Sequence, residues 1–166
     1  MSYTIESKPP CEFSSEQIDE FEQAVREGGE VDPAGLRDRL MRARALVVLL
    51  EGRKLAAVAA LKTPLAAYRA RVSESTGVEL PAAIYPFELG WIYVYPFARR
   101  RKFSQAVSSE ALSKSDGKGV FATTRADNAA MCATLTRLGF WPAGSPYRSQ
   151  CGDQSLQLFL RRAGAS

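Results

Sequence analysis

The stretch from Glu88 to Ser104, ELGWIYVYPFARRRKFS, places a strand, a basic loop and the start of a helix in direct succession. Residues 92–95 are β-branched or aromatic, which favours a strand that Pro96 ends. From Phe103 onward, apolar residues recur at helical spacing. The first amides of such a helix have no intrahelical partner and lie at the positive end of its dipole, so they bind anions readily. The loop before this helix carries four consecutive cations: Arg99, Arg100, Arg101 and Lys102. The segment therefore predicts a phosphate site, with a solvated run of like charges as the alternative.

Length and composition bound the class of protein. A chain of 166 residues, 46% hydrophobic and 24% charged, is typical of one globular domain, so we expect a single domain over residues 1–166. The net charge of +4 favours an anionic ligand but is small for a dedicated nucleic-acid-binding protein. The sequence shows neither an apolar run of membrane-spanning length nor the features of a signal peptide, which predicts a cytoplasmic protein.

The chain contains no histidine, which excludes a histidine-based catalytic triad and histidine-ligated metal sites. A general base must then be a carboxylate, a tyrosine, a perturbed lysine or cysteine, or a chain of water molecules. Cys11, Cys132 and Cys151 are odd in number and far apart, so we expect free thiols and no metal.

Alternating strand and helix signals cover the rest of the chain. Apolar runs bounded by turn residues predict strands over residues 3–7, 45–50, 55–61, 119–124 and 154–161. A capping box of Ser14 and Gln17 predicts one helix, and Asp127 is the expected N-cap of another. The pair Asp32-Pro33 predicts a helix of about three turns. Residues 62–86 are interrupted by proline and glycine, so any helix there must be short.

Two motifs make the chain resemble the GCN5-related N-acetyltransferases, the GNAT family. The family's pyrophosphate loop, Arg/Gln-x-x-Gly-x-Gly/Ala after a Val-x-Pro strand end, matches residues 94–96 and 99–104. A second signature, an asparagine opening a helix that closes on Leu-Gly-Phe, matches Asn128 and residues 138–140. The resemblance covers nearly the whole chain and implies an α/β fold of the α+β type. We therefore expect a mixed, mostly antiparallel sheet of about six to seven strands, splayed at the fourth strand and flanked by about four helices.

The resemblance implies acetyl-coenzyme A (acetyl-CoA) as the cofactor. The backbone of Ile92 and Val94 would pair with the pantetheine arm, and Asn128 would reach this arm from the other side. The pyrophosphate would lie on the loop residues Arg99, Arg100, Arg101, Lys102, Phe103 and Ser104. Lys102 and Ser104 stand where the family usually has glycines, which let the backbone approach a phosphate without a Cβ in the way.

The family transfers an acetyl group by direct attack of an amine, which must first lose a proton. Glu88, at the start of the same strand, is the candidate base, with an edge carboxylate that pairs with an arginine as the alternative. Leu135 occupies the place where many members carry a tyrosine that protonates the leaving thiolate. Tyr147, expected in a loop near the site, is therefore the candidate general acid. A plain surface tyrosine is the alternative, and solvent could equally protonate the thiolate.

Three function classes stay open. The first is an N-acetyltransferase whose amine-bearing acceptor is a small molecule, a peptide or an aminoacyl-tRNA. The second is a catalytically weak or inactive acyl-CoA-binding module, a class that Lys102 and Leu135 favour. The third, least favoured, is a basic nucleic-acid-binding protein. A homodimer is common for the fold that the resemblance implies.

Overall fold

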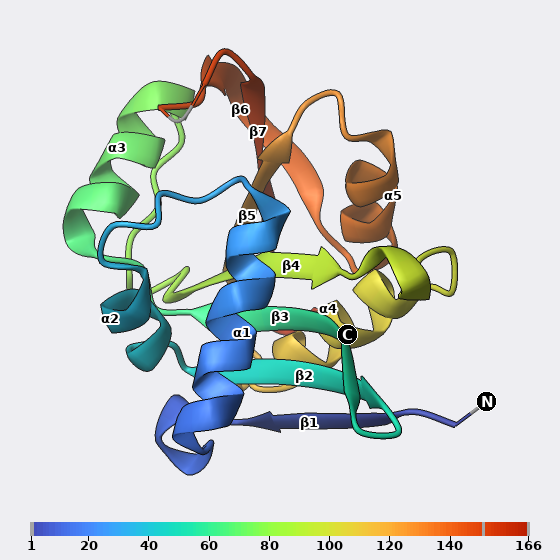
Figure 1. Ribbon diagram of the computed structural model, residues 1–166. Coiled ribbons are helices and arrows are strands. Elements are labelled where there is room, and N and C mark those ends of the chain that lie inside the picture. Colours follow the sequence, from blue (N-terminus) through green and yellow to red (C-terminus); the bar gives the residue numbers. More distant parts are fainter. Residues whose placement is uncertain (1, 151, 166) are drawn as a thin grey trace. The chain divides into compact units, whose positions relative to one another are not determined.

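The computed structural model describes residues 2–150 and 152–165 (Figure 1). Its strands are β1 (Thr4–Lys8), β2 (Ala45–Glu51), β3 (Lys54–Lys62), β4 (Phe87–Val94), β5 (Val120–Arg125), β6 (Trp141–Arg148) and β7 (Ser155–Arg161). Its α-helices are α1 (Ser15–Gly28), α2 (Leu36–Met41), α3 (Ala66–Thr76), α4 (Phe103–Leu112) and α5 (Ala129–Arg137). The strand order is β1-β2-β3-β4-β5-β7-β6. Strands β4 and β5 pair in parallel, whereas β1–β2, β2–β3, β5–β7 and β6–β7 pair antiparallel, as the expected mixed sheet requires.

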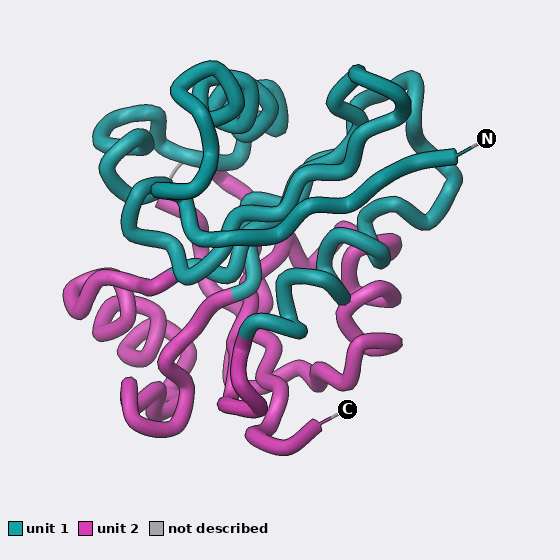
Figure 2. The backbone as a smooth tube through the Cα atoms, turned by 90° about the horizontal axis from the view of Figure 1, so that it is seen from below, with its two compact units in different colours: residues 1–62, 89–114 teal, residues 63–88, 115–166 magenta. Residues whose placement is uncertain are grey.

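The chain divides into two compact units (Figure 2). The first comprises residues 1–62 and 89–114, and the second comprises residues 63–88 and 115–166. The boundary falls inside β4, whose first two residues belong to the second unit. Within the described residues, the register of β4 with β5 is limited to Phe87–Val120 and Glu88–Phe121. The ladder between these parallel strands therefore ends after Glu88, which agrees with the expected splaying of the fourth strand.

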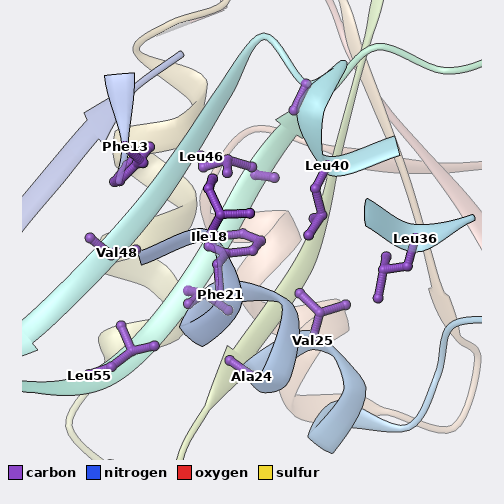
Figure 3. Packing of buried hydrophobic residues seen from close by; sticks show 13 residues of the cluster. Phe13, Ile18, Phe21, Ala24, Val25, Leu36, Leu40, Leu46, Val48 and Leu55 are labelled. Carbon is purple, nitrogen blue, oxygen red and sulfur yellow. The ribbon is translucent and has the colours of Figure 1, made fainter. Parts of the chain in front are cut away.

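Helix α1 covers strands of the first unit with an apolar face (Figure 3). The predicted capping box is present, since Gln17 N donates to Ser14 Oγ at 3.2 Å and Ser14 N donates to Gln17 Oε1 at 2.9 Å. Ile18, Phe21 and Val25 are each at most 3% exposed and lie in the apolar cluster that Figure 3 draws. Full burial of a side chain of this size stabilises the fold by about 1.5–3 kcal/mol. The capping box pairs backbone amides at the N-terminus of α1, and burial of the apolar face of α1 holds the helix in the apolar cluster.

Helix α2 is shorter than the sequence predicts. It begins at Leu36, and Gly35 precedes it in the left-handed conformation with φ 69°. The side chain of Asp32 accepts a hydrogen bond from Ala34 N at 3.0 Å and so forms a local turn before the helix. The predicted start at Asp32-Pro33 and the length of about three turns are wrong, because this local bond competes with helical bonding. Leu36 and Leu40 are nevertheless buried, as the apolar spacing indicates.

The second unit contains the antiparallel strands β5, β7 and β6 together with α3 and α5. Helix α5 begins with Asn128 as its N-cap, whose side chain accepts from Met131 N at 3.1 Å. The prediction of Asp127 as the cap is wrong, because that carboxylate pairs with Arg125 at 3.1 Å instead. The helix therefore starts one residue later than the sequence predicts.

Two of the three cysteines lie within the described residues. Cys11 is exposed and Cys132 is partly buried, and both are free thiols, whereas Cys151 lies outside the described residues. No helix in residues 2–150 and 152–165 is long and apolar enough to cross a membrane.

Candidate active site

The basic loop that follows β4 contains two residues in the left-handed conformation. The φ angles are 65° at Arg100 and 60° at Lys102. This region of backbone space favours glycine, because a Cβ crowds the adjacent carbonyl. Left-handed residues in a turn direct neighbouring amides toward one side, which is a geometry that binds anions. Lys102, which stands where the family motif has a glycine, thus adopts a backbone conformation that favours glycine.

Ser104 is the second departure from the motif, and it differs from the first. It lies inside α4 and is not among the residues with positive φ. An L-residue fits this position without strain, and a small side chain limits the obstruction to a ligand. A glycine would therefore relieve backbone strain at position 102 and not at position 104.

The N-terminus of α4 offers backbone amides ahead of the helical ladder. Lys102 is the N-cap residue and makes no side-chain capping bond. The bond from Ala106 N to Lys102 O, at 3.1 Å, opens the ladder. The amides of Phe103, Ser104 and Gln105 precede that bond, and a helix of 10 residues places the positive end of its dipole beside them. This end of α4 can bind an anionic group.

The four cations of the loop divide into two pairs. Arg101 Nη1 forms an ion pair with Glu51 at 2.7 Å, and Arg99 Nε donates to Val94 O at 3.0 Å. These two side chains hold the loop against the strands of the first unit. Arg100 and Lys102 are exposed, and their charge is directed to solvent. The loop is thus more than a solvated run of like charges, because half of its cations have structural partners.

Strand β4 is irregular where it carries the predicted pantetheine residues. Trp91 has φ 52°, which is unusual for a bulky residue and interrupts the regular pleat of the strand. Ile92 and Val94 follow it and are half-buried. Tyr93 and Tyr95 pack against the apolar cluster of the first unit. The sequence carried no signal for the left-handed Trp91, and the role of Ile92 and Val94 stays a prediction.

Glu88 is the buried carboxylate of the second unit. Its side chain is 3% exposed, and Tyr68 in α3 donates its hydroxyl to Glu88 Oε2 at 2.8 Å. Burial lowers the pKa of the Arg69 guanidinium, and the negative charge of Glu88 opposes this lowering. Tyr68 was missed by sequence reasoning, because 20 residues separate it from Glu88 and no motif marks it.

Tyr147 lies near Glu88, in strand β6 and not in the loop that the sequence suggested. Burial raises the pKa of Tyr147 to about 12, the charge of Glu88 adds to this, and a hydrogen bond with Thr123 opposes it. Burial, and next the charge of Glu88, hold the pKa of Tyr68 well above its usual range. Both phenols therefore stay protonated at neutral pH. The structure thus brings Glu88 together with Tyr147, and adds Tyr68 and Thr123 to them.

The segment before Glu88 is fixed to α3 by an arginine. Arg69 Nη1 donates to Leu80 O at 3.0 Å and to Tyr85 O at 2.6 Å, and Nη2 donates to Pro86 O at 3.4 Å. An open depression of about 460 Å³ lies beside Arg69 and is lined mainly by alanine and proline side chains. The long stretch between β3 and β4 is thereby ordered and contains α3, whose 11 residues make it longer than the short helix that the sequence predicts.

Comparison with solved structures identifies the architecture. ElaA from Escherichia coli has a TM-score of 0.71 at 15% identity, covering 97% of this chain and 100% of that chain. Arabidopsis thaliana NAA60 in complex with acetyl-CoA has a TM-score of 0.69 at 16% identity, covering 96% and 98%. A Desulfovibrio desulfuricans protein assigned to the GNAT family has a TM-score of 0.63 at 16% identity, covering 98% and 99%. This chain has the GNAT fold. No protein-family model and no curated protein sequence matches it.

Two residues of the second GNAT signature have structural roles. Asn128 uses its side-chain oxygen as the N-cap of α5, and its role toward a cofactor stays a prediction. Leu135, which stands in place of the tyrosine of many GNAT proteins, is 1% exposed. It is a core residue and offers no proton.

Proposed function

We propose that this chain transfers an acetyl group from acetyl-CoA to a primary amine by direct attack. The observation that carries the proposal is the basic loop on a GNAT fold, in which left-handed Arg100 and Lys102 lead into the uncapped N-terminus of α4. Two exposed cations and a group of backbone amides suit a diphosphate. NAA60, a solved structure of the same fold, contains acetyl-CoA.

The residues present fit this cofactor. The amides of Phe103 and Ser104, with Arg100 and Lys102, would hold its phosphates, and the backbone near Ile92 and Val94 would hold its pantetheine arm. Arg99 and Arg101 would keep the loop in shape through Val94 and Glu51. Asn128 is proposed to contact the arm. When bound, acetyl-CoA supplies an activated acyl group.

Glu88 would accept the proton that the acceptor amine loses, either directly or through one water molecule. Tyr147 is less suited to give a proton to the leaving thiolate. Its pKa of about 12 exceeds the pKa of an ordinary thiol by about 3.5, so full transfer would be uphill by about 5 kcal/mol. Tyr147 would instead donate a hydrogen bond, and solvent would protonate the thiolate.

A second candidate function is an acyl-CoA-binding module without turnover. The buried Leu135 favours it, because the side chain at that position cannot donate a proton. Both functions require cofactor binding, and they differ in the release of free thiol.

Binding is tested by thermal and chemical denaturation with acetyl-CoA. A ligand at 100 times its dissociation constant adds about 2.7 kcal/mol to the free energy of unfolding. We expect Arg100→Ala with Lys102→Ala to weaken binding about tenfold or more, since two charge-assisted contacts to phosphate are lost. Arg42→Ala, which removes an exposed cation after α2, is the matched control and should bind normally. No stabilisation at saturating acetyl-CoA would reject both functions, and salt-sensitive nucleic-acid binding would then favour the third class.

Turnover is tested by thiol release with amine acceptors of three kinds: small molecules, peptides and aminoacyl-tRNA. Glu88→Gln should bind acetyl-CoA and lose about 10²–10⁴-fold in rate, the usual contribution of a general base. An unchanged rate would reject Glu88 as the base. Binding without thiol release for any acceptor would favour the binding module.

A cytoplasmic location and a homodimer are also proposed, and light scattering tests the dimer.

A further inference from the structure

Helix α3 brings a tyrosine to the buried carboxylate of the second unit. Tyr68 donates its hydroxyl to Glu88 Oε2 at 2.8 Å, and Glu88 is 3% exposed. A buried carboxylate is costly unless hydrogen bonds replace its lost hydration. The Tyr68 hydroxyl supplies one of these bonds directly.

Neighbouring side chains fix the position of Tyr68. Arg69, the next residue, donates to the carbonyl oxygens of Leu80 and Tyr85 and thereby holds α3 against the segment that leads to Glu88. The Arg71 guanidinium lies 5.5 Å from the centre of the Tyr68 ring, a cation–π distance. Tyr68 is therefore held on a fixed helix, and its hydroxyl stays directed at Glu88.

The polar and titratable groups around Glu88 come from three elements. Helix α3 contributes Tyr68 and Arg69, and strand β6 contributes Tyr147. Thr123 on β5 bonds to both tyrosines. Burial holds the pKa of Tyr68 well above its usual range, so this phenol donates at every pH at which an amine acetyltransferase would work.

We propose that Tyr68 is the positioning residue for Glu88, holding the carboxylate in one orientation and in its ionised form. The inference rests on the proposed function, in which Glu88 accepts a proton from the acceptor ammonium and becomes a neutral carboxylic acid. Tyr68 keeps its own proton throughout. Its hydrogen bond is stronger to the carboxylate than to the acid, and so its loss makes the carboxylate easier to protonate.

The first test is the pH profile of kcat/KM for Tyr68→Phe, which removes the hydroxyl and keeps the ring. We expect the acid limb to move upward by about one to two pH units, the worth of one hydrogen bond to a charged group. The KM for acetyl-CoA should not change. Tyr85→Phe, which removes another phenol hydroxyl of the same unit, is the control and should keep the wild-type profile. A Tyr68→Phe rate that falls equally at every pH would overturn the proposal and indicate a structural role.

The second test needs no activity. With ¹³C-labelled glutamate, the carboxyl signal that disappears in Glu88→Gln is followed against pH in the cofactor-free protein. Tyr68→Phe should raise the midpoint of this signal by about one to two pH units, whereas Tyr85→Phe should leave it in place. An unchanged midpoint in Tyr68→Phe would overturn the inference. A raised midpoint without acetyl transfer to any amine would refute the proposed function and keep Tyr68 as the residue that controls the charge of Glu88.

Discussion

Lys102→Gly should make the chain more stable, although it removes a side chain. Lys102 has φ 60° and ψ 25°, a conformation that costs a residue with a Cβ roughly 1–2 kcal/mol. Glycine relieves this cost but loses about 0.5–1 kcal/mol more backbone entropy on folding. The expected net gain is about 0.5–1 kcal/mol. In a chain of this size that gain raises Tm by about 1–4 °C.

Urea denaturation of three variants measures the effect. Lys102→Ala removes the charge and keeps the Cβ, so it should be no more stable than the wild type. Ser104→Gly introduces glycine at the other motif position, which lies inside α4 without a positive φ, and should cost about 0.5–1 kcal/mol. Acetyl-CoA should bind Lys102→Gly more tightly than Lys102→Ala. Both variants lack the lysine charge, but only the glycine variant also lacks the Cβ that obstructs a phosphate. Unfolding of Lys102→Gly and Lys102→Ala at the same urea concentration would refute this account of the loop.

Three further predictions concern stability. Tyr147→Phe should reduce the loss of stability between pH 10 and 12. The pKa of Tyr147 is about 12 in the folded chain and 10.0 in the unfolded chain, so between these values the folded chain keeps a proton that the unfolded chain releases. The resulting stabilisation is complete below pH 10 and is lost as the pH rises toward 12. This difference in pKa corresponds to about 2.7 kcal/mol, or about 1–2 kcal/mol after a discount for partial exposure to solvent. An equal loss of stability at alkaline pH in the wild type and in Tyr147→Phe would contradict this prediction. Leu135→Ala should cost about 2–5 kcal/mol in urea denaturation, because the side chain is 1% exposed, and a cost below about 1 kcal/mol would mean that it is not core. Ser14→Ala should cost about 1 kcal/mol through loss of the capping box, measured by thermal denaturation, whereas an unchanged Tm would argue against the cap.

Features that depend on short-range chemistry could be predicted from the amino-acid sequence alone. The capping box of Ser14 and Gln17 depends on hydrogen bonds between residues close in the chain. The strands with apolar runs follow from the periodicity of neighbouring side chains. The basic loop before α4 was visible for the same reason, as a strand end, a run of cations and a helix start in one segment. Local competition was harder to judge, and the turn bond of Asp32 shortened α2.

Long-range packing sets which distant residues meet and which conformation each loop residue adopts. Tyr68 reaches Glu88 because α3 lies beside the start of β4, and no local signal encodes that placement. The left-handed Lys102 is equally a result of folding, since a lysine has no intrinsic preference for positive φ, and packing of the loop through Arg101 and Glu51 has to impose it. The sequence therefore identified the anion-binding segment, and long-range packing determined the surroundings of the carboxylate, because side-chain contacts depend on the positions of whole elements.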